Sequence, residues 1–587
     1  MSIVLLATTI RRIADYMENA AGNNAMMANA QHSGGMNHAG MAHSTKPKKG
    51  SFVNPMSHMD DPVQKLINST QHTHVAIRNG AWSDPRTWKN VRVQDDNAKV
   101  MIVKGTNVTY DLVSDARIRV ISVEGTLKFA TGKDTQLKVE TILNGASGQL
   151  DVGTAGNAVR ADKSARIIFT SDRAIDTKWD PKQLSKGLVS HGVVNVQGAE
   201  KADSGTLVGD VKKGACVLRF KEPLTGGKVG DRIVLGGTKH NSRGNNGDNS
   251  KYQDEVLKIT SINGREIRFE NENIKSGNRN VLRYDHVRSK LGGVSDKLSL
   301  YAANLSRNVS FETEKGKSVP INRRAHIMLM HNPNVSVVNA GLYELGRSDK
   351  SRLVDDPIKN TDGSKGNGTN PRGRYAMHLH RTGDDSGKAA LVKGNAVIGS
   401  PGWGIAQHSS HAGIEDNVVF DVVGAGISAE AGDETGWWNN NLTIKTTGIG
   451  NIVDFNSQSV AREKRFDFGV QGTGYWIQGP GLIQNTNNKA ISSNGAGMTI
   501  FGSSLNQSYL RDVTTLEIKD LPANLQKLFP PGQKEVDIRD LPMGTVSGLE
   551  SYNASLGLRI WAHNTNFDGE LAFNTKDPET AHQGRSL

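Results

Sequence analysis

The sequence predicts an all-β protein in which a β-roll or sandwich-like module is followed by a parallel β-helix. Beyond Thr73, short β-branched runs such as 98–105 and 165–171 recur, separated by Gly, Asn or Asp. Short runs bounded by turn residues are typical of strands. Capped helical windows are nearly absent, and a repeat of 22 residues follows later in the chain. Together these observations favour stacked strands over helices.

The amino-terminal residues 1–72 have the composition of a disordered tract. This segment is rich in Gly, Met and His and shows almost no apolar periodicity. Its thioethers and four of its imidazoles also suit copper capture, which is the alternative interpretation. The imidazoles belong to His32, His38, His43 and His58. The first residues are apolar before they turn basic, the reverse of a secretory signal, so we expect no standard signal peptide.

Charge and cysteine content narrow the functional classes. The 587 residues include 71 basic and 59 acidic side chains, a net charge of +12 that suits a polyanionic partner such as nucleic acid or an acidic polysaccharide. The single cysteine, Cys216, excludes an internal disulfide framework and any CxxC metal site. No apolar run approaches the roughly 20 residues of a membrane span, so we expect none.

Several motifs resemble the G-eight domain, the glycine-marked β module of fibrocystin and of the cell-migration-inducing and cell-surface hyaluronidases. They are NGAWSDPRTW (79–88), VEGTLKF (123–129) and VGDRIVLGG (229–237), and the resemblance extends to about Leu442. It implies that the module leads into a right-handed parallel β-helix. We therefore expect a disordered tract (1–72), a G-eight module (73–230), a small connecting β subdomain (231–300) and a β-helix (301–587).

An internal repeat predicts the coils of the β-helix independently of the family. Gly404-Ile405 recurs as Gly426-Ile427, and Asn395 recurs as Asn417, both at an offset of 22 residues; Asn441 follows 24 later. Each coil of a solenoid buries its inward residues only when it is stacked on another coil. We therefore expect Asn395 and Asn417 to stack on adjacent coils.

This register predicts a cluster of imidazoles and one carboxylate. His378 and His380 share a strand face because alternate residues point the same way. We expect His378, His408 and Glu430 to form one column on three neighbouring coils, with His380 beside it. Such a donor set suits one divalent ion of zinc or calcium type. The alternative is a pair of solvated histidines on an open face.

The hyaluronidase-related resemblance falls on the same positions. GRYAMHLHRTGD (373–384) and DVVGAGISAEAGDE (421–434) are similar to family segments, although Ala376 stands where the family has Pro and Glu430 is followed by Ala-Gly-Asp. The resemblance implies glycan-directed activity. The candidate catalytic residues are His378, His380, His408, Glu430 and Asp433; the candidate substrate-binding residues are Arg374, Arg381, Asp384 and His411.

Two functions follow from these patterns. The first is cleavage of an acidic, uronate-containing polysaccharide, either by paired carboxyls of a hydrolase or by a base and a cation of a lyase. The second is a non-catalytic carbohydrate-binding or matrix-binding adhesin, which does not need the His and acid column. Nucleic-acid binding rests on charge alone and is not expected. Either glycan function places the protein outside the cytoplasm, in an extracellular, periplasmic or cell-surface setting.

Overall fold

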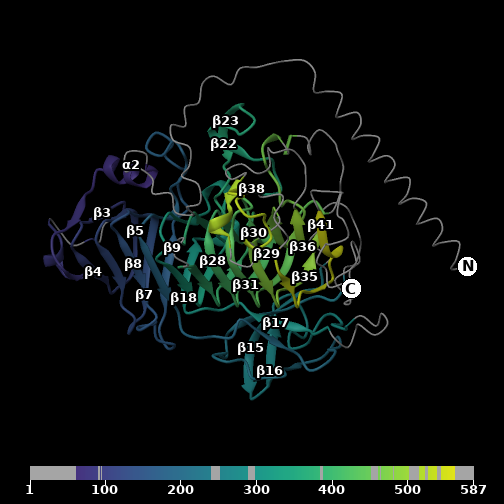
Figure 1. The fold of residues 1–587 in the computed structure, drawn as a ribbon. Helices are drawn as coiled ribbons and strands as arrows, with labels where there is room; N and C mark the ends of the chain where they lie inside the picture. The colour runs from purple at the N-terminus through teal and green to yellow at the C-terminus, as the bar shows by residue number, and fades with distance from the viewer. Residues whose placement is uncertain are drawn as a thin grey trace, which may run out of the picture. The chain divides into compact units, whose positions relative to one another are not determined.

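The computed structural model describes residues 61–89, 93, 96–239, 252–288, 298–383, 388–450, 461–462, 464–479, 482–501, 515–521, 526–537 and 544–561. Most of the expected amino-terminal tract, with His32, His38, His43 and His58, lies outside these residues. The described part is almost entirely strand (Figure 1). Its one α-helix longer than a turn is α2 (Pro62–Ser69), and no helix within the described ranges is long and apolar enough to cross a membrane.

Three parallel ladders of strands make a β-helix, which confirms the expected all-β fold. Each coil contributes one strand to each ladder.

The first ladder contains β1 (His74–Ala76), β3 (Lys99–Ile102), β5 (Val113–Val123), β7 (Thr135–Asn144), β10 (Gly187–Ser190), β19 (His326–Met330), β24 (Met377–His380), β27 (Ile405–His408), β30 (Ala425–Ala429), β33 (Thr473–Gln478), β36 (Ala496–Phe501) and β41 (Leu556–Trp561). The second begins in the long strands β5 and β7 and continues through β9 (Ala165–Phe169), β18 (Val309–Thr313), β21 (Ala340–Tyr343), β26 (Ala396–Ile398), β29 (Val418–Val423), β32 (Leu442–Thr447), β35 (Lys489–Ser493) and β40 (Glu550–Tyr552). The third contains β2 (Gly80–Ala81), β4 (Asn107–Tyr110), β6 (Thr126–Phe129), β8 (Gln149–Val152), β11 (Val193–Gln197), β20 (Val335–Val338), β25 (Ala390–Lys393), β28 (His411–Glu415), β31 (Thr435–Asn439), β34 (Leu482–Thr486) and β39 (Val546–Ser547).

The ladders pass through the expected boundary near residue 300 without a break. β10 pairs in parallel with β7 on one side and with β19 on the other. The amino-terminal module therefore consists of the first coils of the same solenoid. A single buried apolar core runs from Trp82 to Ile500 along its axis.

An antiparallel sheet is inserted within one coil, between β11 of the third ladder and β18 of the second, and forms the lower part of Figure 1. Its strands are β12 (Ser204–Thr206), β13 (Val217–Arg219), β14 (Arg232–Leu235), β15 (Glu255–Asn263), β16 (Glu266–Asn271) and β17 (Tyr301–Asn304). The subdomain therefore extends beyond the expected limits of 231–300, because β12 pairs with β17. It packs against the outer face of the second ladder through residues that include Phe420 and Ile444.

The remaining elements are short. Two antiparallel hairpins are formed by β22 (Asp355–Lys359) with β23 (Lys365–Asn370), and by β37 (Thr515–Glu517) with β38 (Glu535–Asp537). Single 3₁₀ turns lie at Pro85–Thr87, Gly316–Ser318, Ile321–Arg323 and Ile518–Asp520.

In the coils from β25 to β35, the corner from the third ladder to the second is a two-residue turn that carries the repeating Asn. Its first residue is left-handed, as at Asp416 with φ 57° and Asn440 with φ 56°. The buried Asn that follows donates to the next one. Asn395 Nδ2 lies 2.9 Å from Asn417 Oδ1, and Asn417 Nδ2 lies 2.9 Å from Asn441 Oδ1. The stacked amides confirm the expected register of these coils.

Candidate metal centre

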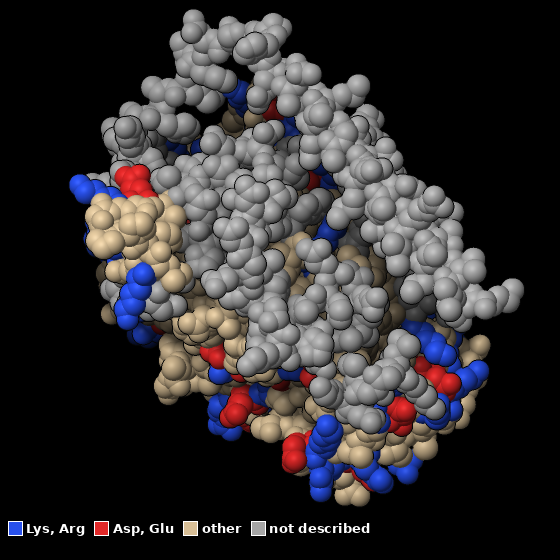
Figure 2. Space-filling view, turned by 45° about the vertical axis from the view of Figure 1, so that its right-hand side comes forward, with Lys and Arg blue, Asp and Glu red and all other residues tan. Residues whose placement is uncertain are grey.

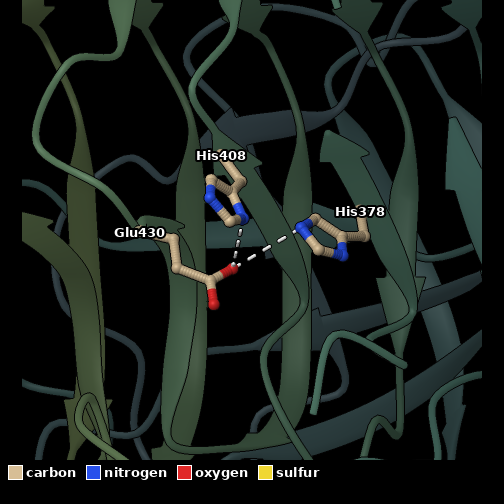
Figure 3. A group of neighbouring side chains, drawn as sticks. All are labelled: His378, His408 and Glu430. Carbon is tan, nitrogen blue, oxygen red and sulfur yellow. Dashed lines mark ion pairs between the residues drawn. The ribbon is translucent and has the colours of Figure 1, made fainter. Parts of the chain in front are cut away.

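Three buried side chains from three adjacent coils converge at the ends of first-ladder strands (Figure 3). His378 lies on β24, His408 is the last residue of β27, and Glu430 follows β30. Glu430 Oε2 lies 3.5 Å from His378 Nε2 and 3.6 Å from His408 Nδ1. One ligand atom from each residue lies within 4.8 Å of the others. The sequence-predicted convergence of these three residues is therefore present.

The expected register within this cluster was wrong by two residues. His408 pairs with His380, whereas His378 pairs with Ala406. Met377 pairs with Ile405, so Tyr375 lies level with Trp403, and the two rings stack with centroids 4.5 Å apart. A slip of two residues keeps every side chain on the same face. His378 therefore still reaches Glu430, although it does so from a diagonal position.

The protonation of His378 leaves a lone pair aimed at Glu430. Its Nδ1 lies 2.9 Å from the carbonyl oxygen of Gly373, which can only accept, so Nδ1 carries the proton. Burial lowers the pKa of His378 to about 4, although the Glu430 charge opposes that shift. The ring is therefore neutral near pH 7, and its unprotonated Nε2 faces a carboxylate oxygen. A cation placed between Nε2 and the carboxylate oxygen would be coordinated by both atoms.

The spacing fits a small tetrahedral ion. Bonds of about 2.0–2.1 Å at tetrahedral angles place ligand atoms roughly 3.4 Å apart. The distances from Glu430 Oε2 to the two imidazole nitrogens, 3.5 and 3.6 Å, are close to this separation. Two imidazole nitrogens and one carboxylate are typical zinc ligands, whereas Ca²⁺ prefers six to eight oxygens. The trio could hold a zinc-type ion with one open position.

His380 lies beside the trio without joining it. Its ring meets His408 edge to face at 4.6 Å and His378 at 5.6 Å between centroids. Burial, followed by the charges that His408 and His378 can carry, lowers the pKa of His380 well below its usual value. The imidazole is therefore neutral at pH 7.

Two further histidines extend this row, and sequence reasoning missed them. His331 stacks edge to face with His380 at 5.5 Å, and His191 stacks with His331 at 5.4 Å. His191 Nδ1 lies 2.8 Å from Asp61 Oδ2, at the amino-terminal cap of α2. Both histidines directly follow first-ladder strands, as Glu430 does. That shared position is the signal that could have found them.

Glu434 is another residue that sequence reasoning missed. This buried carboxylate accepts backbone N–H bonds from Ser409, Glu430, Ala431 and Gly432, at 3.1, 3.0, 2.6 and 2.7 Å. It thereby fixes the turn that presents Glu430 to the end of β27. Burial and the adjacent Asp433 carboxylate raise the pKa of Glu434 to about 7. Asp433, a candidate acid, is buried in the same turn.

The candidate substrate-binding residues are placed differently from one another. Arg374 is buried, and its Nε, Nη1 and Nη2 donate to the carbonyls of Gln183, Arg372 and Lys182. It therefore ties loops together, and the expectation that it holds a substrate is corrected. Arg381 follows β24 with its N–H on the carbonyl of His408. Asp384 lies outside the described residues.

Lys350, rather than Arg374, is the buried cation near Glu430. Lys350 Nζ lies 3.0 Å from Asp467 Oδ1, 2.9 Å from the carbonyl of Phe468 and 4.1 Å from the centroid of the Trp403 ring. Burial lowers the pKa of Lys350, while the charges of Asp467 and Glu430 oppose this. Lys350 therefore joins the segment before β24 to the segment before β33.

Comparisons with known proteins agree with this architecture. The model of the G8 domain matches residues 87–209, and the model of the CEMIP beta-helix matches residues 365–520. The class is thus a G8 domain joined to a parallel β-helix. The chain is thus similar to a G8 domain and, further along, to a CEMIP beta-helix.

One curated relative and several solved structures are also similar. Human (Homo sapiens) Fibrocystin-L is 23% identical over 453 residues, which are 72% of this chain and 10% of that protein. The chain thus spans about a tenth of the length of this relative. The tailspike gp61 of Pseudomonas phage phi297 is 11% identical, with 68% of this chain and 56% of that chain covered and a TM-score of 0.16. The tailspike gp49 of Pseudomonas phage LKA1 is 11% identical, with coverages of 68% and 54% and a TM-score of 0.17. Likenesses at these scores add nothing to the fold described above.

Proposed function

We propose that the chain is a divalent-metal-dependent enzyme that cleaves an acidic, uronate-containing, hyaluronan-like polysaccharide outside the cytoplasm. The observation that carries this proposal is the spacing of His378, His408 and Glu430 around a point that a zinc-type ion would fill. Adhesion alone does not need buried, unprotonated imidazole facing a carboxylate. The CEMIP-like architecture and the net charge of +12 support an acidic glycan as the substrate class.

The residues around the cluster suit proton abstraction beside a uronate carboxylate. A bound ion would supply the positive charge that stabilises the carboxylate as the proton leaves. His380 lies against both imidazoles of the trio, and this proximity makes it the candidate base. Glu434 holds Glu430 in place, and Lys350 adds a positive charge near it.

Hydrolysis is the second possible chemistry at this site. It requires one carboxyl as acid and another as base or nucleophile. Asp433 and Glu434 are adjacent buried carboxyls, and the raised pKa of Glu434 suits a group that carries a proton near neutrality. The products distinguish the two routes, because a lyase leaves an unsaturated sugar end and a hydrolase does not.

The alternative function is a non-catalytic carbohydrate or matrix binder. A rigid solenoid with exposed coil faces serves binding as well as catalysis. On the face shown in Figure 2, the described basic and acidic side chains are interspersed, so charge does not mark one strip of that face as the binding surface.

The decisive experiment incubates the full chain with hyaluronan, chondroitin, polygalacturonate and a neutral glucan. Reducing ends and unsaturated ends are measured before chelation, after chelation and after zinc is restored. Bound metal is measured separately by mass spectrometry. We expect one zinc per chain, cleavage of an acidic glycan only, and loss of both upon chelation.

Matched variants assign the activity to the cluster. His408→Ala should abolish zinc binding and cleavage, whereas His72→Ala should change neither, because His72 contacts Ser122 on the first coils. Stoichiometric binding of a glycan without any product would favour the adhesin. Cleavage that survives chelation would refute the metal.

A further inference from the structure

A half-buried tryptophan lies on the outer face of the third ladder. Trp437 and Trp438 are neighbours on β31, so they point to opposite faces of the strand. Trp438 is fully buried, and its Nε1 donates to Gln407 Oε1 at 2.8 Å. Trp437 points outward and keeps part of its surface in solvent. An outward indole on a strand has no role in the core and needs another explanation.

Gly413 makes the room that this indole occupies. Trp437 pairs with Gly413 on the preceding coil. A Cβ atom at position 413 would lie 2.3 Å from Cζ2 and 2.5 Å from Cε2 of the indole. Any side chain at 413 would therefore displace the ring. The glycine keeps the indole against the backbone of the coil beneath it, so the opposite side of the ring is the one that faces solvent.

The surroundings of Trp437 are polar. His411 meets the indole edge to face, with centroids 6.4 Å apart, and its Nδ1 lies 2.8 Å from Thr435 Oγ1. On the next coil the strand partner of Trp437 is the exposed Gln484. One aromatic ring with hydrogen-bonding neighbours offers too little apolar area for a stable protein interface. It does match a sugar ring, which has an apolar face of C–H groups and a rim of hydroxyls.

The surface formed by Trp437 and His411 lies on the same two coils as His408 and Glu430 of the candidate metal centre. His411 follows His408 by three residues, and Trp437 follows Glu430 by seven. Thr435 N donates to the carbonyl of Ser410, which fixes the two turns against each other. A polymer that crosses the end of β27 and β30 therefore meets Trp437 as it passes onto the third ladder.

We propose that Trp437, with His411 at its edge, is a binding subsite for one sugar ring of the acidic polysaccharide. The inference rests on the proposed function for the identity of the polymer. The C–H face of the sugar stacks on the indole, which attracts it through the electron-rich face of the ring. The subsite contributes to affinity and not to bond cleavage, since Trp437 bears no group that transfers a proton.

The test measures binding of hyaluronan fragments to chelated full-length protein by calorimetry, so that no cleavage intervenes. Trp437→Ala is expected to weaken binding roughly tenfold, the usual size for loss of one stacking contact. Trp437→Phe should retain most of the affinity. Gly413→Val should weaken binding as much as Trp437→Ala, because it displaces an intact indole. Asn107→Ala, at an exposed position of β4 on a distant coil of the same ladder, is the surface control and should bind as the wild type does.

The zinc content and the thermal unfolding of each variant are measured alongside. Unchanged zinc content with weakened binding supports the subsite and leaves the metal proposal untouched. Wild-type affinity in Trp437→Ala, or equal loss in Trp437→Phe, would overturn it. Absence of polysaccharide binding by the wild type would overturn it as well. If Trp437→Ala binds and cleaves the polysaccharide as the wild type does, the subsite is refuted and the proposed function stands.

Discussion

Replacing Glu434 by Gln tests how the turn after β30 holds Glu430. The carboxylate accepts three N–H bonds on Oε1 and one, from Gly432, on Oε2 at 2.7 Å. The amide keeps one oxygen for the three donors and places its NH₂ group against the N–H of Gly432. One charge-assisted bond is lost and two donors face each other in a buried site. We expect a loss of about 2–3 kcal/mol in the free energy of unfolding.

The same change should weaken metal binding, because groups that orient a ligand typically contribute 10–100-fold to affinity. Zinc affinity is measured by competition with a coloured chelator, and stability is measured by urea unfolding. Glu266→Gln is the matched control, since this exposed carboxylate pairs with Arg219 on the inserted sheet and should change stability by less than about 1 kcal/mol. Wild-type zinc affinity together with wild-type stability in Glu434→Gln would refute the reasoning.

Three further predictions follow from buried groups. Asn417→Ala should lower the free energy of unfolding by about 2–4 kcal/mol, because Asn395 loses an acceptor for two buried N–H groups; urea unfolding measures this, and a loss below 1 kcal/mol would contradict it. Gly187→Ala should prevent soluble expression, since its φ is 131° and a Cβ would lie 1.9 Å from the carbonyl oxygen of His326; a folded variant would contradict this. Chelated protein should lose stability as the pH falls from 6.5 towards 4, because the folded pKa of His378, about 4, lies below its unfolded value, so the unfolded chain binds more protons in that window. His378→Gln should flatten this slope in urea unfolding, and an unchanged slope would count against the assignment.

The coil repeat could be predicted from the sequence because each Asn has to stack on the next one. The amides of Asn395, Asn417 and Asn441 bond along the ladder, so spacing alone predicts their contact. His408 and Glu430 follow from the same spacing, since both stand at the ends of equivalent strands. The position of His378 could not be read in this way, because 27 residues separate His380 from its partner His408, so the 22-residue repeat does not extend back to β24.

Residues that act through backbone geometry stay hidden in a sequence. Glu434 looks like one of several acids in a turn, and only the folded chain shows four N–H groups on its carboxylate. Arg374 shows the converse: beside a His-x-His it resembles a substrate ligand, yet its donors are taken by carbonyls of distant loops. The limits of the inserted sheet were also hidden, because β12 and β17 are far apart in sequence.

The corners of the coils differ in a way that bears on how this protein can diversify. The corner that bears the Asn amides always takes two residues in the coils from β25 to β35, as at 416–417 and 440–441. The corner that precedes the first ladder varies from a single residue, Gly424, to the segment 344–376. Nearer the amino terminus the corner from the third ladder to the second, between β11 and β18, holds the inserted sheet instead. In the coils from β25 to β35 the Asn corner keeps the pitch, while the corner before the first ladder accepts insertions. Exchanging such an insertion between homologues would retarget recognition while the coils and their ligands stay in place, which makes this corner the natural point for grafting new specificity.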